Sequence, residues 1–359
     1  MEDLVKEKLF NGIYKDKTVF LTGHTGFKGS WIALWLTLMG ADVTGYSLEP
    51  PTTPNHFELL KLNINGIIGD IRDKDKLNNA LLNAKPDIVF HMAAQPLVRY
   101  SYKEPLETFG TNVIGTANVF EVCRKVKNIK AIVNITSDKC YENKEDKRPY
   151  KEGDPMGGYD PYSASKGCAE LVTASYRNSF FNINEYGKAH NTLLASVRAG
   201  NVIGGGDWAE DRLIPDIMRA VSRGKKVIIR NSQATRPWQY VLEPLSGYLM
   251  LGQKLLEGKK EFASGWNFGP DNNEVMTVEN IVKLVNKEWN DISYEIKSDN
   301  NNPHEAGFLS LDNNKAKTML GWKPVWGIEK TIKKTVVWYK NYYKENRINS
   351  VDDIMDYIK

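Results

Sequence analysis

A tyrosine and a lysine four residues apart form the clearest catalytic pair in the sequence. Tyr162 and Lys166 stand in the run YSASK, and their i, i+4 spacing places both side chains on one face of a helix. A nearby ammonium favours a phenolate and lowers the pKa of a tyrosine from ~10 towards the working range. Tyr162 could then act as a general base that takes a proton from an alcohol while hydride leaves the carbon. The same pattern also occurs on exposed helix faces.

An apolar run at 131–135, AIVNI, ends in residues that could carry a second kind of chemistry. Ser137, Asp138 and Lys139 follow it almost at once, and ligands of open α/β sheets bind at the carboxyl ends of the strands. A simple oxidation needs no second acid–base pair, whereas an elimination does. One group must remove a carbon-bound proton while another protonates the departing hydroxyl. Asp138 and Lys139 therefore indicate an elimination, although Ser-Asp-Lys is also a common composition of surface turns.

A glycine-rich run, TGHTGFKG at 22–29, lies between a predicted strand and a predicted helix. Gly23, Gly26 and Gly29 allow a tight turn in which backbone N–H groups approach a pyrophosphate at the helix N-terminus. Its place at the start of a βαβ unit predicts dinucleotide binding rather than a plain turn. Lys28 could meet a 2′-phosphate or could be a solvated loop lysine.

These motifs require a scaffold, and the first half of the chain alternates short apolar runs with helical patterns. Strand runs that are apolar throughout are typical of parallel sheets covered on both faces. The sequence therefore predicts an α/β fold with a Rossmann-like doubly wound parallel sheet. The predicted strands are 18–21, 41–46, 66–70, 87–91, 131–135 and 192–197.

After about residue 200 the alternation stops, and the segments become more charged and mixed. Apolar residues recur at helical spacing behind Thr277, a plausible N-cap. Asp312 could cap a second, short helix that ends at Gly321. We therefore expect a smaller C-terminal domain of mixed structure.

Composition sets broad limits on partners and compartment. The chain has 359 residues, a net charge of +4 and 26% charged residues, without the concentrated basic block that predicts a nucleic-acid or membrane surface. Three cysteines without metal spacing argue against both a metal site and a disulfide framework. The charged N-terminus lacks the apolar segment of a signal peptide, and no apolar stretch approaches the ~20 residues of a membrane span. We expect a cytoplasmic protein without a bound metal.

The glycine spacing G-x-x-G-x-x-G, together with the Tyr-x-x-x-Lys pair, resembles the extended short-chain dehydrogenase/reductase superfamily. Gly69-Asp70 after the third strand, HMAA at 91–94 after the fourth and Asn112 on the central helix strengthen the resemblance. It implies NAD as the cofactor. The contacts that it implies for the cofactor are Gly23, His24, Thr25, Gly26, Phe27, Lys28, Gly29, Asp70, Ile71, Ala93, Ala94, Gln95, Asn112, Tyr162 and Lys166.

The end of the second predicted strand departs from the superfamily pattern. An Asp or Glu usually stands there and holds the adenosine ribose hydroxyls of NAD, but here the place is taken by Ser47, with Glu49 two residues later. No arginine stands there to suit NADP. The local residues thus leave the choice between NAD and NADP open. The missing carboxylate predicts a more loosely held cofactor.

Within the superfamily, Ser137-Asp138-Lys139 is similar to the corresponding run of nucleotide-sugar 4,6-dehydratases. Most of these carry Asp-Glu, and Asp-Lys points to the branch that acts on CDP-glucose. The resemblance implies that Tyr162, assisted by Lys166 and Ser137, deprotonates the sugar 4-hydroxyl. Lys139 would then remove the C5 proton while Asp138 protonates the departing 6-hydroxyl. The lysine must be neutral for this step, and a neutral Asp138 would avoid an ion pair that keeps it charged.

Blocks along nearly the whole chain carry this resemblance, and they imply where CDP-glucose binds. Asn201 would contact the sugar, and Arg212 with Leu213 would form part of a lid. Arg236 would grip the diphosphate with two hydrogen bonds, and Asn267 would be a further diphosphate contact. The implied assembly is a homodimer or homotetramer. The implied domains are an NAD-binding domain of 1–200 plus roughly 234–262, and a nucleotide-sugar-binding domain of 201–233 and 263–359.

Two other functions stay open at this point. An epimerase or decarboxylase acting on a nucleotide sugar would share the fold, but the Asp138-Lys139 pair speaks against it. A redox-sensing NAD(P)-binding protein without catalysis would often lack the Tyr-x-x-x-Lys pair, which this chain keeps.

Overall fold

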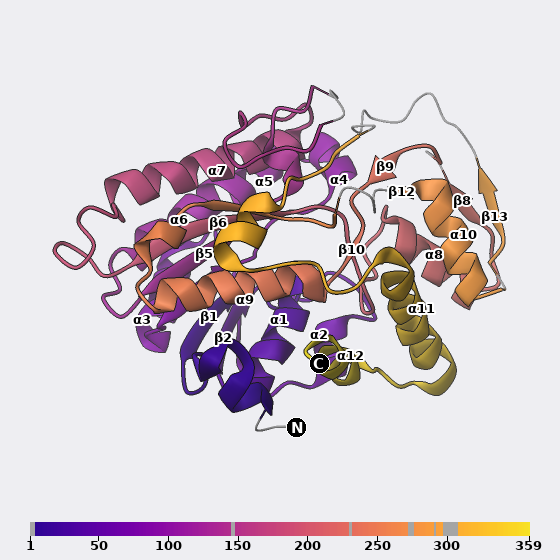
Figure 1. The fold of residues 1–359 in the computed structure, drawn as a ribbon, viewed down its shortest axis with the longest axis horizontal. Helices are drawn as coiled ribbons and strands as arrows, with labels where there is room; N and C mark the ends of the chain where they lie inside the picture. Colours follow the sequence, from indigo (N-terminus) through magenta and orange to yellow (C-terminus); the bar gives the residue numbers. More distant parts are fainter. Residues whose placement is uncertain (1–3, 145–147, 230–231, 272–275, 291, 297–307) are drawn as a thin grey trace.

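A seven-stranded, fully parallel sheet forms the centre of the molecule (Figure 1). The computed structural model describes residues 4–359 except 145–147, 230–231, 272–275, 291 and 297–307. The strand order is β11-β6-β5-β4-β1-β2-β3, which confirms the predicted doubly wound α/β fold. The strands are β1 (Thr18–Thr22), β2 (Asp42–Ser47), β3 (Asn65–Ile68), β4 (Ile88–His91), β5 (Ala131–Ile135), β6 (Leu193–Ala199) and β11 (Gly265–Phe268).

Both faces of the sheet are buried because the strand side chains alternate between two apolar clusters. In β1, Val19 and Leu21 pack in the cluster that holds the helices α1 (Phe27–Leu38) and α9 (Leu242–Leu256), whereas Phe20 packs in the opposite one. The second cluster is completed by apolar residues of α3 (Lys74–Ala84) and α6 (Thr116–Cys123). Burial on both faces explains the largely apolar runs of the central strands β1, β4, β5 and β6, whereas β3 at the edge of the sheet is mostly exposed.

The seventh strand of the sheet comes from beyond the predicted domain boundary. The boundary at residue 263 assigned residues 265–268 to the second domain, but β11 pairs with β6, with Trp266 opposite Val197 and Phe268 opposite Ala199. The four residues GWNF contain a glycine and an asparagine and are too short to show a strand pattern. Residues 265–268 thus belong to the central sheet, and the division into two domains stays a prediction.

The second lobe lies to the right in Figure 1. The helix predicted behind Thr277 is confirmed, since the Thr277 side chain accepts a hydrogen bond from the Asn280 backbone N–H at 3.2 Å. The short helix predicted near Asp312 is a single turn, Ala316–Leu320, that ends at Gly321 with φ +74°. The main elements of this lobe are α8 (Leu213–Ser222), β8 (Val227–Ile229), β9 (Thr235–Arg236), β12 (Met276–Thr277), α10 (Val278–Glu288), β13 (Tyr294–Ile296) and α11 (Ile328–Glu345).

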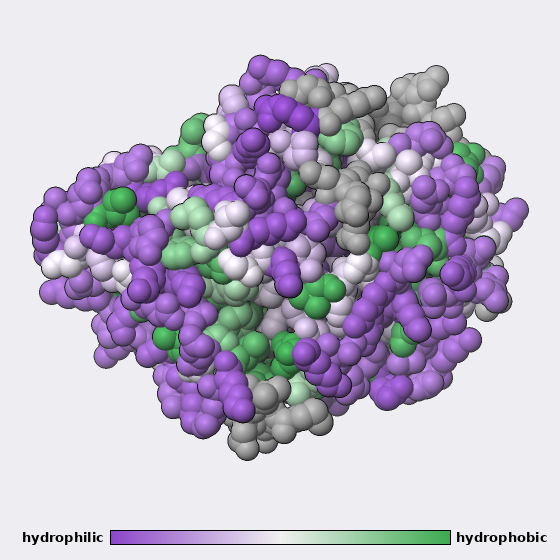
Figure 2. Space-filling model, viewed as in Figure 1, coloured by the Kyte–Doolittle hydropathy of each residue, from purple (hydrophilic) through white to green (hydrophobic). Residues whose placement is uncertain are grey.

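Most of the face seen in Figure 2 is hydrophilic. Of the helices in the described part of the chain, none combines the length and apolarity that a membrane span requires. The remaining helices and strands are α2 (His56–Leu60), α4 (Val98–Lys103), α5 (Pro105–Phe109), α7 (Pro161–Ser179), β7 (Val202–Ile203), β10 (Gln239–Tyr240) and α12 (Ser350–Tyr357), with short 3₁₀ or π turns at Leu4–Lys8, Leu9–Gly12, Gly110–Gly115, Asp138–Cys140 and Lys260–Phe262.

Candidate active site

A cavity of about 1060 Å³ opens at the carboxyl ends of β1, β4, β5 and β6. The strand order reverses at β1, which lies between β4 and β2, and ligands bind at such switch points in open α/β sheets. The cavity is closed on its other side by residues of the second lobe. It gathers most of the predicted site residues: Gly23, Thr25, Gly26, Phe27, Lys28, Gly29, Asp70, Ile71, Ala93, Ala94, Ser137, Asp138, Lys139, Tyr162, Lys166, Asn201, Arg212, Leu213 and Arg236.

The glycine loop between β1 and α1 has the geometry of a pyrophosphate cradle. Gly23 has φ +77°, and a Cβ there would lie 2.8 Å from the Ala93 nitrogen. A Cβ on Gly29 would lie 1.9 Å from the Gly23 carbonyl oxygen. Gly26 caps α1 without a side-chain hydrogen bond, so the first N–H groups of the helix are open to a ligand on the cavity side. These residues fit the pyrophosphate of NAD.

Replacing Gly23 with alanine should weaken NAD binding. The new methyl group would meet the backbone of Ala93, and overpacking of this kind costs about 1–3 kcal/mol, or roughly tenfold or more in affinity. Isothermal titration of NAD into the variant measures the change. Gly187→Ala is the matched control, because Gly187 also has a positive φ, +82°, but no atom lies within 4 Å of the added Cβ. Equal NAD affinities in the two variants would contradict the cradle.

At the end of β2, Ser47 is tied to the glycine loop. Its hydroxyl lies 2.7 Å from Thr25 Oγ1, which donates a hydrogen bond to the Leu48 carbonyl at 2.9 Å. Ser47 also lines the cavity. The serine thus fixes the turn where the superfamily usually places a carboxylate.

Three residues predicted to contact the cofactor do not line the cavity. His24 is buried and packs edge-on against Phe57, and burial lowers the pKa of its imidazole to about 4. The Asn112 side chain holds the loop after β4, bonding to the backbone N and O of Gln95 at 2.8 and 3.0 Å and to Ser165 Oγ at 2.9 Å. His24, Gln95 and Asn112 therefore support the walls of the site and do not face a ligand in this structure.

Lys28 faces the catalytic groups, which corrects the expectation of a 2′-phosphate contact or a solvated lysine. Burial and the nearby charge of Arg212 lower the pKa of its ammonium to about 8, while Asp138 opposes the shift. The ammonium also lies 6.0 Å from the centre of the Tyr248 ring on α9. The side chain therefore lies among the charged groups of the reaction centre.

The turn after β5 brings a hydroxyl, an acid and a base together. The Ser137 hydroxyl donates to Asp138 Oδ1 at 2.9 Å and accepts from the Lys139 backbone N–H at 3.3 Å. Asp138 is buried, and its Oδ2 has no hydrogen-bond partner among the described residues. Lys139 Nζ lies 3.9 Å from Asp138 Oδ1. The two side chains are thus in ion-pair contact, contrary to the expectation that they would avoid one.

Tyr162 and Lys166 lie in the first turns of α7, whose N-cap Asp160 accepts a hydrogen bond from the Ser163 backbone N–H. Both side chains are buried, and Lys166 Nζ lies 6.0 Å from the centre of the Tyr162 ring. Burial raises the pKa of the phenol to about 12, although Ser137 favours the anion. The predicted lowering of the tyrosine pKa is therefore wrong for this structure, because the desolvation of the phenolate dominates.

The buried ammonium of Lys166 should make the stability of the NAD-free protein depend on pH. Burial and the charge of Lys28 lower its pKa to about 7, whereas an unfolded lysine titrates near ~10.4. Between these values the unfolded chain binds more protons, so stability rises with pH. We expect the free energy of unfolding in urea to rise less between about pH 7.5 and 9.5 in Lys166→Met than in the unaltered protein. Identical slopes would contradict the lowered pKa.

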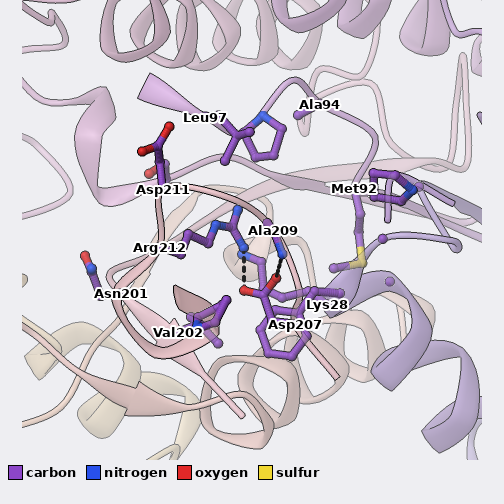
Figure 3. A pocket seen from close by; sticks show the side chains of 18 of the residues that line it. Lys28, Met92, Ala94, Leu97, Asn201, Val202, Asp207, Ala209, Asp211 and Arg212 are labelled. Atoms are coloured by element: carbon purple, nitrogen blue, oxygen red, sulfur yellow. Dashed lines mark hydrogen bonds and ion pairs between the residues drawn. The ribbon is translucent and has the colours of Figure 1, made fainter. Parts of the chain in front are cut away.

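The second lobe presents the predicted substrate contacts to the cavity. Asn201 follows β6, and Arg236 belongs to β9. Arg212 Nη1 donates to Asp207 Oδ2 at 2.8 Å, and Asp207 Oδ1 also accepts from the Ala209 backbone N–H at 3.0 Å (Figure 3). Asp207 thereby holds the Arg212 guanidinium inside the cavity.

Asn267 does not reach the cavity. Its side chain is fully buried, its Oδ1 accepts from the Tyr141 hydroxyl at 2.7 Å, and its Nδ2 donates to the Tyr150 carbonyl at 2.9 Å. Both polar ends are thus used within the protein. The predicted diphosphate contact is not available in this structure.

Two supporting features were not predicted. Gly200 lies where an added Cβ would be 2.5 Å from Pro237 Cγ and 3.3 Å from Asp138 Oδ2, so a larger residue would displace the acid. Glu170 and Arg198 form a buried ion pair beneath the catalytic turn. A glutamate one helical turn after Lys166, and an arginine inside an apolar strand run, were the available sequence signals.

A family model described as GDP-mannose 4,6 dehydratase matches residues 20–335. The chain is 54% identical over 349 residues to the CDP-glucose 4,6-dehydratase of Salmonella typhimurium, an alignment that covers 96% of this chain and 97% of the relative. It is 29% identical to GDP-mannose 4,6 dehydratase 1 of Arabidopsis thaliana, with 89% of each chain covered.

Solved structures share the fold at lower sequence identity. An epimerase of Methanothermobacter thermautotrophicus superposes with a TM-score of 0.80 at 21% identity, covering 95% of this chain and 97% of the other. The UDP-glucose 4-epimerase of Thermus thermophilus, in complex with NAD, gives a TM-score of 0.75 at 23% identity, with 90% and 98% covered.

Proposed function

Because the chain belongs to the GDP-mannose 4,6-dehydratase family, we propose that it converts CDP-glucose to CDP-4-keto-6-deoxyglucose and water. The protein is an enzyme, an NAD-dependent 4,6-dehydratase and therefore a lyase. One observation carries the proposal of dehydration: the Asp138–Lys139 pair lies in the same cavity as Tyr162, Lys166 and the glycine loop. The 54% identity to a relative that acts on CDP-glucose supports the choice of nucleotide.

The first step is oxidation at C4 of the sugar. Tyr162 takes the proton of the 4-hydroxyl, and the Ser137 hydroxyl orients the same oxygen. NAD, held by the glycine loop, would supply the hydride acceptor and donor for this reaction. The charged form of Lys166 favours the phenolate. The ketone at C4 then acidifies the C5 proton.

The second step is elimination of water across C5 and C6. Lys139 takes the C5 proton, and Asp138 protonates the departing 6-hydroxyl, so the pair must enter the step as neutral lysine and protonated acid. This form holds the same number of protons as the ion pair, and the two side chains, 3.9 Å apart in this structure, must approach to hydrogen-bond distance for a proton to pass between them. Lys139 then returns a proton to C5 when the hydride is delivered to C6.

The nucleotide diphosphate binds on the second lobe. Arg236 offers a planar fork of donors that suits two phosphate oxygens, and Arg212 and Leu213 cover the ligand from the start of α8. Asn201 contacts the sugar beside the catalytic turn. These roles fit the places of the four side chains in the cavity wall.

The enzyme forms a homodimer or homotetramer and works in the cytoplasm. Three exposed apolar side chains on contacting helical segments support self-association, which would cover them: Leu106 is 86% exposed, Ile114 59% and Leu171 60%. Three free cysteines fit a reducing compartment.

A panel of CDP-, dTDP-, GDP- and UDP-sugars tests the function directly. We expect turnover of CDP-glucose with loss of one water in the product mass, together with the absorbance of a keto-sugar in alkali. An epimerase would leave the mass unchanged, and a non-catalytic sensor would bind NAD without turning over any sugar. Either result would overturn the proposed function.

A further inference from the structure

A buried ion pair lies directly behind the catalytic turn. Arg198, at the end of β6, donates from Nε to Glu170 Oε1 at 2.9 Å and from Nη2 to Oε2 at 2.8 Å. The two side chains are only 5% and 3% exposed. Burying two charges is costly even when they are paired, and replacing such a pair with apolar residues is often neutral or stabilising. Stability alone is therefore a weak reason for its presence.

The pair is bonded to the chain on both sides of the catalytic turn. Thr136, the residue before Ser137, donates from Oγ1 to Glu170 Oε1 at 2.5 Å. Tyr141, two residues after Lys139, accepts a hydrogen bond from Arg198 Nη1 at 2.6 Å through its hydroxyl oxygen. The three-residue turn is thus held at its entry by the carboxylate and at its exit by the guanidinium.

The ion pair also connects the catalytic turn to α7, the helix that carries Tyr162 and Lys166. Glu170 lies on α7 one turn after Lys166. Its carboxylate accepts hydrogen bonds from Thr136, directly after β5, and from Ser196 and Arg198 on β6. The carboxylate therefore joins α7 to both strands. Any shift of α7 relative to β5 would change the position of Tyr162 relative to Ser137. Misplacement by about 1 Å can cost roughly a hundredfold in rate.

We propose that Glu170 and Arg198 are positioning residues that fix Ser137, Asp138 and Lys139 relative to Tyr162 and Lys166. The proposal rests on the proposed function, which gives the turn residues their roles. It assigns no contact with substrate or cofactor to the pair. Thr136 and Tyr141 are the links through which it acts.

The test breaks one link and leaves the ion pair itself intact. Thr136→Val keeps the shape of the side chain but removes the hydrogen bond to Glu170 together with a longer one to the Val197 carbonyl at 3.1 Å, and Thr136→Ser restores the hydroxyl. Thr173→Val is the matched control: Thr173 is a buried threonine of α7 whose hydroxyl accepts from Asn134 of β5 at 2.7 Å. It also joins α7 to β5, but its hydroxyl bonds to Asn134 and to the Ala169 carbonyl instead of to the ion pair or the turn.

We expect Thr136→Val to lower kcat roughly ten- to hundredfold with KM for CDP-glucose unchanged, Thr136→Ser to restore kcat, and Thr173→Val to keep it. Tyr141→Phe, which cuts the second link, should lower kcat in the same way. The melting temperatures of the two valine variants should fall by similar amounts. Unchanged kcat in both Thr136→Val and Tyr141→Phe, or an equal loss in Thr173→Val, would overturn the proposal. Failure of the unaltered enzyme to dehydrate CDP-glucose would instead overturn the proposed function.

Discussion

Lys139→Ala is expected to abolish dehydration while leaving oxidation at C4 in place. The variant keeps Tyr162, Lys166 and the glycine loop, so hydride can still leave C4, but no group remains to take the C5 proton. Loss of a positioned acid–base group costs about 10²–10⁴-fold in rate. The measurement pairs the near-ultraviolet absorbance of reduced cofactor with deuterium incorporation at C5 in heavy water. The first signal should persist, and the second should vanish.

Lys144→Ala is the control for this variant, because the Lys144 side chain is 67% exposed and pairs with Glu142 on the surface. It should behave like the unaltered enzyme in both measurements. Deuterium incorporation at the normal rate in Lys139→Ala would rule out the lysine as the C5 base. Loss of both signals would place Lys139 in the oxidation step.

Tyr162→Phe should stop the reaction one step earlier. Removing the phenolic hydroxyl leaves no base for the 4-hydroxyl proton, and we expect kcat to fall about 10²–10⁴-fold. Because the C5 proton becomes acidic only after C4 is oxidised, exchange at C5 should disappear together with the cofactor signal. NAD affinity, measured by isothermal titration, should change little, since the ring is retained.

Tyr159→Phe provides the comparison. Tyr159 is 78% exposed and has no lysine at i+4, so its hydroxyl should not affect the rate. If Tyr162→Phe kept C5 exchange, a different group would have to deprotonate the 4-hydroxyl. Together, the outcomes in Lys139→Ala and Tyr162→Phe show whether deprotonation of the 4-hydroxyl precedes removal of the C5 proton.

Most of the fold follows from local patterns in the sequence. Six of the seven strands were predicted to within a few residues, and four of them, β1, β4, β5 and β6, are buried, largely apolar runs. β11 was missed because GWNF is held in the sheet by pairing with β6, not by its own propensity. Its partner strand lies about seventy residues earlier in the chain, so a pattern of neighbouring residues cannot reveal the pairing.

The residues of the candidate site could be predicted from the sequence, but the directions of their side chains could not. The motifs Ser137-Asp138-Lys139 and YSASK, each identified from its spacing and its predicted place at the sheet edge, do meet in one cavity. Directions of side chains were not predictable: Lys28 faces the reaction centre, and Asn267 faces the interior. The rise in the Tyr162 pKa reflects burial by the whole fold, which a lysine at i+4 cannot reveal.

The late position of β11 also bears on how the protein must be synthesised. Until residue 268 has been made, β6 is the edge of the sheet, with its outer N–H and C=O groups unpaired. Such an edge invites pairing with other chains. A fragment that stops near residue 200 would therefore be prone to aggregate, even though it contains the glycine loop, the catalytic turn and Tyr162. The central sheet is not built from one uninterrupted piece of the chain, and it cannot be complete before all of residues 201–233, the first segment of the second lobe, have been synthesised.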